Sequence, residues 1–239
     1  MIFLNKSKIR AFLEKMGQFF KGKNFRIDPE FPILLLFTIS ISRLSDLIRG
    51  AFKLNFSEFV FVGPGVKLKC LNKIKIGRGA SIGSNVLING FSINGVIIGN
   101  SVSIGSNSII EASGSISEMG LGISIGDNTG IGSFCFIGGA GGVSIGNDVI
   151  MGQWVSFHPQ NHNFNSLSLP IRLQGVNSKG ISVGNDCWVG AKVTFLDGAN
   201  VGEGCVIAAG SVVRGIIPAY SVIAGVPAKV IKSRSSDNK

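Results

Sequence analysis

A six-residue repeat sets the pattern of apolar and polar positions along most of the chain. From Val183 the sequence divides into VGNDCW, VGAKVT, FLDGAN, VGEGCV, IAAGSV and VRGIIP. The first position of each hexad is Val, Ile or Phe, and the fifth is small in most of them. The same frame fits the hexads that begin at Ile76, Ile98, Ile125 and Ile145. Self-similarity at a fixed period is the signature of a repeat architecture.

The period itself predicts the fold class. One apolar anchor every six residues fits neither the period of a helix nor the alternation of a single strand. It suits an all-β solenoid in which three short strands per coil each direct one large side chain inward. Glycine then takes turn positions that other residues enter only at a steric cost. Successive coils should stack about 4.8 Å apart, like neighbouring strands.

Insertions interrupt the repeat near residues 90–97, 114–122 and 138–144, and a much longer one spans 158–180. Insertions in a solenoid are expected to leave it as loops, and such loops often carry function. The longest one begins within SFHPQNHNFNSLSLPI and holds both histidines of the chain, His158 and His162. Imidazole is the usual group for taking a proton near neutral pH, so this loop is a candidate active-site arm; the alternative is that its histidines are ordinary surface residues.

The segment before the repeat has a helical pattern. Residues 8–20 and 33–48 each place apolar residues at helical spacing, with a break at Asp28 and Pro29. We expect a helical extension over 1–57, a solenoid domain over 58–232 and a polar tail over 233–239. Residues 1–53 hold ten Lys or Arg against four Asp or Glu. The helices therefore either cap the end of the solenoid or lie on an anionic membrane surface.

Composition narrows the possible classes of protein. The chain has 34 glycines without a collagen period, and 45% of its residues are apolar, which excludes collagen and a disordered chain. The net charge of +10 comes without a nucleic-acid-binding motif, so no nucleic-acid partner is expected. Cys135, Cys187 and Cys205 occupy the small fifth position, where buried thiols are expected. The N-terminus does not read as a signal peptide and no apolar run is long enough to span a bilayer, which favours a cytoplasmic protein.

The hexads, together with the closing segment IPAYSVIAGVPAKVIK, resemble the hexapeptide-repeat acyltransferases over about residues 60–232. The resemblance implies a left-handed parallel β-helix. It also implies a homotrimer with active sites between subunits, acetyl-CoA as the donor and no metal.

The same resemblance implies roles for residues in and after the loop. In galactoside and streptogramin acetyltransferases the catalytic histidine opens the loop, and that position matches His162, with His158 as a second candidate nearer the wall. Backbone amides of WVGA, after Trp188, are candidates for stabilising an oxyanion. The residues implied to line the coenzyme A site are Gly152, Trp188, Ala191, Ala209 and Gly210, with Lys229 and Lys232 at its phosphates.

One departure from that family concerns the acceptor. Galactoside-type enzymes carry acidic residues on the coil before the catalytic one, but residues 136–146 here contain no carboxylate. Acceptor contacts are therefore expected from Trp154, Asn161 and Asn163. This puts a simple galactoside in doubt and leaves open a larger glycan.

The predicted function is O-acetylation of a sugar hydroxyl during assembly of a bacterial capsule, lipopolysaccharide or exopolysaccharide. Peripheral membrane contact through residues 1–53 is compatible with a lipid-linked acceptor. An N-acyltransferase acting on an amino sugar or nucleotide sugar is the nearest alternative, and a non-catalytic β-helix module is another. A zinc enzyme on the same fold is disfavoured, because a catalytic zinc site needs three protein ligands and the chain has two histidines.

Overall fold

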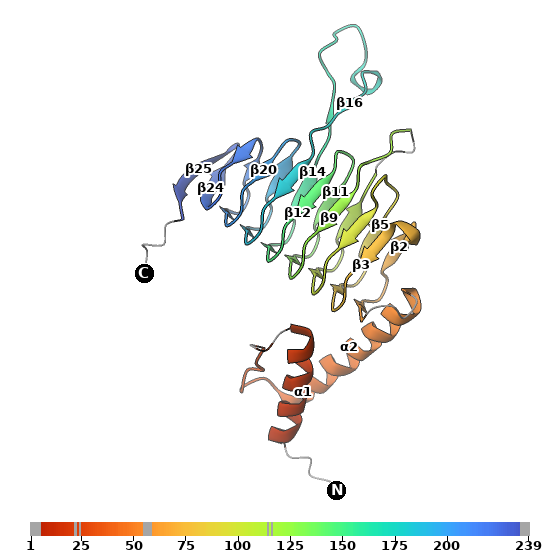
Figure 1. Ribbon diagram of the computed structural model, residues 1–239, viewed down its shortest axis with the longest axis vertical. Coiled ribbons are helices and arrows are strands. Elements are labelled where there is room, and N and C mark those ends of the chain that lie inside the picture. Colours follow the sequence, from red (N-terminus) through yellow and green to blue (C-terminus); the bar gives the residue numbers. More distant parts are fainter. Residues whose placement is uncertain are drawn as a thin grey trace.

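A computed structural model describes residues 6–21, 23, 25–54, 59–113, 115 and 117–234. The chain from residue 59 onward winds through three sheets in turn, which form the three faces of a solenoid and are parallel except for the last two strands of the chain (Figure 1). We call the nine-stranded sheet sheet I and the two seven-stranded sheets sheets II and III, in the order in which the chain visits them. The predicted left-handed parallel β-helix is confirmed.

The strands are short and follow one another from coil to coil. Sheet I contains β1 (Phe61–Val62), β4 (Ser81–Ile82), β7 (Ser103–Ile104), β10 (Gly130–Ile131), β13 (Ile150–Met151), β18 (Trp188–Val189), β21 (Val206–Ile207), β24 (Ser221–Gly225) and β25 (Ala228–Ser233). Sheet II contains β2 (Lys67–Lys69), β5 (Leu87–Asn89), β8 (Ile109–Glu111), β11 (Phe136–Gly138), β14 (Ser156–His158), β19 (Thr194–Leu196) and β22 (Val212–Val213). Sheet III contains β3 (Ile74–Ile76), β6 (Val96–Ile98), β9 (Ile123–Ile125), β12 (Val143–Ile145), β17 (Ile181–Val183), β20 (Asn200–Val201) and β23 (Ile216–Ile217).

The first position of each hexad fills the interior. The anchors from residue 183 onward are at most 3% exposed, and anchors of successive coils pair in register, as Phe157 does with Phe195. These two rings stack with their centroids 4.5 Å apart. The three cysteines at the fifth position are buried as expected, which leaves Cys70 as the exposed thiol. Burial raises the pKa of the Cys187 thiol to about 11 and also raises the pKa of Cys135.

Two turn positions explain the glycines of the repeat. At the second position of the hexad the backbone of the next coil lies so close that a Cβ on Gly190 would sit 2.5 Å from the amide nitrogen of Ala209. The fourth position has a positive φ in Asp186, Lys192 and Gly204. Asn, Asp and Gly tolerate that conformation best, which is why they recur there.

The corner between sheets III and I is a tight turn in every coil and is held by a ladder of side chains. The Oδ1 atom of Asn147 accepts a hydrogen bond of 2.7 Å from the backbone amide of Asp127, one coil earlier. Asn185 does the same for the amide of Asn147 at 2.8 Å, and Asp127 does so for the amide of Asn100 at 2.7 Å. Each rung satisfies a turn amide that has no strand partner.

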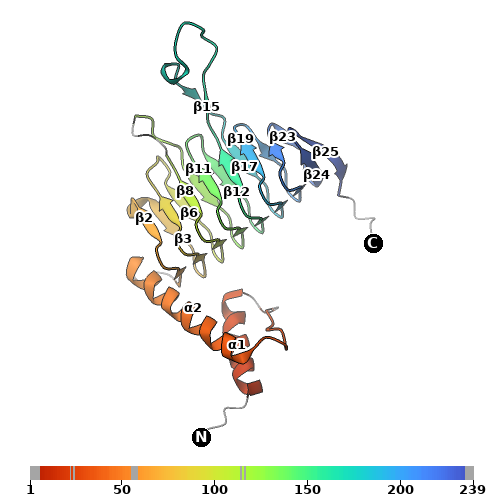
Figure 2. The same ribbon diagram turned by 180° about the vertical axis from the view of Figure 1, so that it is seen from behind.

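The corner between sheets II and III carries all of the insertions that the sequence predicts. The loops around residues 90–95, 112–122 and 139–142 stack on one another, with backbone hydrogen bonds from Asn94 to Leu121 and from Leu121 to Ala140. The long segment 159–180 leaves from the same corner and projects well beyond the solenoid (Figures 1 and 2). The loop predicted from the sequence is therefore an arm on a ridge of shorter loops.

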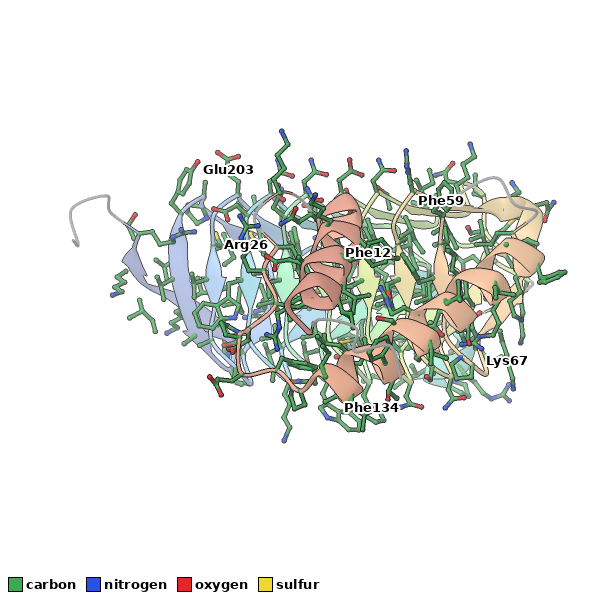
Figure 3. All side chains as sticks on the ribbon, turned by 90° about the horizontal axis from the view of Figure 1, so that it is seen from below. Phe12, Arg26, Phe59, Lys67, Phe134 and Glu203 are labelled. Carbon is green, nitrogen blue, oxygen red and sulfur yellow. The ribbon has the colours of Figure 1, made fainter. Side chains whose placement is uncertain are left out.

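Two helices precede the solenoid, as predicted: α1 (Lys6–Lys21) and α2 (Ile33–Lys53). Figure 3 views the molecule from the side on which both helices lie. Helix α2 packs against β1, and Leu36 and Gly50 are its buried residues. Among the helices of the described residues, none is long and apolar enough to cross a bilayer. Residues 235–239 of the predicted polar tail lie outside the described part of the chain.

The face of α2 that meets the solenoid carries cations, which the apolar pattern did not predict. The first coil has no coil before it, so its outward carbonyls need other donors. Arg49 donates to the carbonyl of Val62 at 2.9 Å and Lys53 to that of Val66 at 3.1 Å. Arg43 lies 4.2 Å over the ring of Phe61. The helix caps the solenoid, but with its cations and not with its apolar stripe.

Candidate functional site

The arm is a hairpin whose first rungs hold one of the two histidines. Strands β15 (Asn161–His162) and β16 (Val176–Asn177) pair antiparallel, with Asn161 opposite Asn177 and His162 opposite Val176 (Figures 1 and 2). A single 3-10 turn, η2 (Ile171–Leu173), lies in the part of the arm beyond this ladder. The ladder fixes the backbone of His162 while its side chain stays exposed to solvent.

Asp197 fastens both strands of the arm to the solenoid. Its Oδ1 atom accepts hydrogen bonds from the backbone amides of Lys179 at 2.7 Å and Gly180 at 2.9 Å. Its Oδ2 atom accepts one of 3.1 Å from the side chain of Asn161, the residue just before His162. One carboxylate on the following coil therefore links the outgoing and returning ends of the arm.

The two histidines occupy different environments. His158 is the last residue of β14, so it lies on the solenoid wall, as the sequence analysis expected for this residue. Its ring stacks on Phe136 of the previous coil with centroids 5.6 Å apart. His162 lies four residues further on, in the arm ladder. Both side chains are exposed, so each is accessible to a substrate.

The two asparagines predicted to contact an acceptor make hydrogen bonds inside the arm. The side chain of Asn161 donates to Asp197. Asn163 donates through Nδ2 to the carbonyl of Gln174 at 3.0 Å and accepts through Oδ1 from Asn177. These amides shape the arm, and their contact with an acceptor stays a prediction.

A carboxylate that the sequence analysis did not select lies on the same face as His158. Glu111 ends β8 and is opposite Gly138 on the coil before β14. Its Oε1 atom accepts a hydrogen bond from the side chain of Asn89. Two coil spacings of about 4.8 Å separate the strand of Glu111 from that of His158, and Gly138 has no side chain to fill the interval. The repeat could have revealed this neighbourhood, because residues 111, 138 and 158 share one hexad position and therefore line up on successive coils.

The residues predicted to line the donor site gather at a different corner, between sheets I and II. Gly152 lies against Ala191 of the next coil, where an added Cβ would be 2.6 Å from its amide nitrogen. Gly190 lies against Ala209 in the same way, and Gly210 follows with a φ of +72° and open space around it. The column is thus flat and lined by backbone.

Exposed aromatic side chains flank that column. Trp154 has a positive φ and stacks on Phe134 with ring centroids 4.5 Å apart and planes 7° apart. Trp188 is opposite Ile150 on sheet I, and their side chains are 60% and 64% exposed. The fixed backbone and the aromatic rings form a surface that suits a ligand with an extended apolar arm.

The segment WVGA is predicted to supply an oxyanion donor. The amide of Trp188 donates to the carbonyl of Cys205 at 2.9 Å, and that of Gly190 donates to the carbonyl of Ile207 at 2.8 Å. Both are therefore committed to the neighbouring coil. Ala191, at the end of the segment, is the candidate that keeps the prediction open.

The predicted phosphate contacts lie at the end of the solenoid. Strands β24 and β25 form an antiparallel hairpin in which Lys229 is opposite Ala224 and Lys232 opposite Val222. Both lysines are exposed. Within the described residues, no group of three or more His, Cys, Asp or Glu is arranged to hold a metal ion.

A groove of about 550 Å³ lies on the outer face of sheet III, beside the root of the arm. Its floor carries Ser144, Ser182 and Asn200, and Lys179 stands at its rim. Neither histidine is among the described residues that line it. In a single chain, the histidines, the donor column and this groove are therefore three separate surfaces of the solenoid.

Comparisons with known proteins show that part of the repeat is similar to bacterial transferases. Residues 180–215 match the family model for the bacterial transferase hexapeptide, six repeats. A Mycobacterium tuberculosis protein named as a probable acetyltransferase, Rv3034c, is 41% identical over 92 residues, which are 38% of this chain and 31% of that protein. WbbJ of Escherichia coli K12, named as a lipopolysaccharide biosynthesis O-acetyl transferase, is 35% identical over 120 residues, 47% of this chain and 61% of its own length.

A chloramphenicol acetyltransferase of Morganella morganii is 35% identical over 111 residues, 46% of this chain and 53% of that enzyme. The matches therefore span less than two thirds of each of these relatives. Among solved structures, the hexapeptide-repeat acetyltransferase VCA0836 of Vibrio cholerae aligns over 94% of this chain and 92% of its own, with 17% identity and a TM-score of 0.48.

Proposed function

We propose that the chain is a hexapeptide-repeat acetyltransferase, as its similarity to that family model and to these relatives supports, and that it transfers an acetyl group from acetyl-CoA to a sugar hydroxyl of a bacterial surface polysaccharide. The observation that carries the proposal is the exposed imidazole of His162, held by a two-rung ladder at the root of the long arm. The name of WbbJ supports a glycan acceptor. The chloramphenicol acetyltransferases among the relatives have a different kind of acceptor.

The reaction needs a base, a donor site and an oxyanion site. In the proposed mechanism His162 takes the proton of the acceptor hydroxyl while its oxygen attacks the thioester carbonyl. A backbone amide, for which Ala191 is the candidate, would stabilise the oxyanion. The C–S bond then breaks, and the imidazolium returns its proton to the departing thiolate, so the products are an acetyl ester and free coenzyme A.

The acceptor site is proposed beside the arm root. Glu111 and His158 flank Gly138 on sheet II, about 10 Å apart by coil spacing, which is wide enough for one sugar ring. A carboxylate and an imidazole are suitable partners for sugar hydroxyls. Asn161, Asn163 and Trp154 remain proposed contacts, although both amides already make hydrogen bonds within the arm.

An assembly is proposed because one chain holds the parts of the site at different corners. The histidines lie at the corner between sheets II and III, whereas Gly152, Ala191 and Ala209 line the corner between sheets I and II. If the arm of one copy reaches along the I–II corner of the next, base and thioester meet. A homotrimer with three such sites is the proposed form, with Lys229 and Lys232 at the phosphates of the donor.

A lipid-linked acceptor would bring the reaction to the cytoplasmic face of the membrane. The basic residues of α1 and the segment after it, such as Lys15, Lys23 and Arg26, would favour contact with anionic lipid there. This contact is proposed for the α1 segment alone, because the cations of α2 are used on the solenoid.

The first test is calorimetric titration of the full chain with acetyl-CoA, which requires no knowledge of the acceptor. We expect about one site per chain, with weaker binding in Lys229→Ala. Free-thiol release is then measured with sugars, amino sugars and chloramphenicol as acceptors. Release should fall at least about a hundredfold in His162→Ala. A fully active His162→Ala with an inactive His158→Ala would transfer the role of base to His158, and no binding of acetyl-CoA by folded protein would reject the proposal.

A further inference from the structure

One face of α2 is apolar, regular and turned away from the other residues that the structure describes. Five large side chains on this face are between 42% and 77% exposed. We call them the α2 stripe: Leu34, Phe37, Ile41, Leu44 and Ile48. Exposed apolar residues scattered singly are ordinary, but a contiguous row of this size on one helix marks an interaction surface.

The stripe cannot be part of the core of its own chain. Arg43, Arg49 and Gly50 lie on the opposite face of the helix and meet the first coils of the solenoid. A Cβ on Gly50 would overlap the carbonyl oxygen of Val60, so helix and solenoid are already in close contact on that side. The helix cannot rotate its apolar face inward without losing the hydrogen bonds of Arg49 and Lys53.

The spacing of the stripe favours another helix as its partner. Its members are separated by three, four, three and four residues, which is the spacing of a coiled-coil seam. Thr38, Ser42 and Ser45 border the stripe without charge. A helix that binds an anionic membrane carries Lys or Arg in such positions, but those of α2 point to the solenoid.

The area of the stripe is close to that of a stable interface. Taking about 200 Å² for each fully exposed large side chain, the exposed fractions amount to roughly 600 Å². Each partner in a standard interface contributes about 800 Å².

We propose that the α2 stripe is a seam through which two copies of this chain associate, helix against helix. A second copy supplies an identical stripe, and such a surface is self-complementary when two copies meet about a twofold axis. The proposal concerns α2 and does not depend on the enzymatic activity proposed above. It adds an interface to any contact between the solenoids.

The test is the self-association of the full chain, measured by sedimentation over a dilution series. In Ile41→Lys/Ile48→Lys we expect the dissociation constant for self-association to rise at least about tenfold, because four buried ammonium groups would face apolar side chains across the seam. Ile41→Ala/Ile48→Ala, which keeps the helix, should shift it in the same direction by less.

The matched control is Thr38→Lys/Ser42→Lys, which adds the same charge to the same helix beside the stripe. It should leave the dissociation constant within about twofold of wild type. Circular dichroism checks that every variant keeps its helices. Co-sedimentation with phosphatidylglycerol vesicles runs in parallel. If the stripe variants associate as wild type does, the proposal is overturned, and a simultaneous loss of vesicle binding would assign the stripe to lipid.

Discussion

Two corners of the solenoid, built from the same repeat, differ in almost every physical respect. At the III–I corner every turn is tight, and Asn100, Asp127, Asn147 and Asn185 form a ladder that pairs the turn amides. At the II–III corner the turns open into insertions and into the arm with His162. The same repeat thus carries a regular hydrogen-bonded ladder at one corner and every insertion at another.

The largest expected effect comes from closing the space under the arm. Gly141 lies beneath both ends of the arm, and a Cβ there would overlap the carbonyl oxygen of Pro159 and lie 2.6 Å from the Cβ of Ser178. Gly141→Ala must displace the arm root, so we expect acetyl transfer to fall about a hundredfold or more. Steady-state kinetics of thiol release measure it.

Gly130→Ala is the control for that prediction. A Cβ at this position in sheet I meets only the hydroxyl of Ser103 at 3.4 Å. It should leave both activity and melting temperature close to wild type. Equal losses in the two variants would mean that glycine content, and not the position of the arm, sets the activity.

A smaller effect is expected when the arm is unfastened without crowding. Asp197→Ala removes the acceptor of hydrogen bonds from Asn161, Lys179 and Gly180. We expect activity to fall about tenfold, with faster proteolysis of the arm and a loss of at most about 2 kcal/mol in the free energy of unfolding. Asp197→Asn keeps one side-chain oxygen and should recover part of the activity. Undiminished activity in Asp197→Ala would show that the ladder alone holds His162.

Substitutions at the III–I corner should lower the stability of the protein and leave its activity unchanged. Asn147→Ala leaves the turn amide of Asp127 without its acceptor. The free energy of unfolding should fall by about 1–2 kcal/mol, measured by urea denaturation. Activity of the folded protein should stay within about twofold of wild type. Ser144→Ala, on the outer face of the neighbouring strand, serves as the control. A loss of activity in Asn147→Ala at unchanged stability would contradict the division between the corners.

The smallest effect concerns pH and the buried thiols. The pKa of Cys187 is raised to about 11 in the folded state because burial disfavours the thiolate, whereas an unfolded thiol ionises near its ordinary pKa, about 8.5. Its contribution to stability is therefore fully present below about pH 8.5 and is lost as pH rises toward 11. We expect the wild type to lose about 1–2 kcal/mol more than Cys187→Ala over that range. Parallel pH curves for the two proteins would contradict this.

The sequence predicted the solenoid well because the same apolar hexad position recurs in every coil. Each anchor, such as Val183 or Phe195, is buried for the same reason as the others, so an error at one position is corrected by the next. The insertions also stood out as breaks in a regular period. Their shared corner follows from the same count, because each break falls after the second strand of its coil.

The sequence did not predict which face of α2 meets the solenoid. Its stripe of Phe37, Ile41, Leu44 and Ile48 reads as a core-facing surface, because an amphipathic helix ordinarily buries its apolar side. The end of a β-solenoid instead presents unpaired carbonyls, and Arg49 and Lys53 satisfy them. Helical periodicity cannot reveal that a partner surface is polar.

The links around the arm were also beyond the repeat pattern. Asp197 sits in the hexad FLDGAN, where its carboxylate reads as an ordinary turn residue. Only the path of the arm brings it to Asn161 and Gly180, 36 and 17 residues away in the chain. The roles of His162 and His158 likewise stay predictions, since both side chains face solvent in one chain.

The capped end of the solenoid has a consequence for the solution behaviour of the protein. A parallel β-helix has two open ends that differ from each other, so an uncovered one could accept the other end of a second molecule and grow head to tail without limit. Arg49 and Lys53 occupy the carbonyls of Val62 and Val66. An incoming strand therefore cannot form hydrogen bonds with these carbonyls. Helix α2 thereby acts as a terminator that keeps a stackable fold from becoming a fibre.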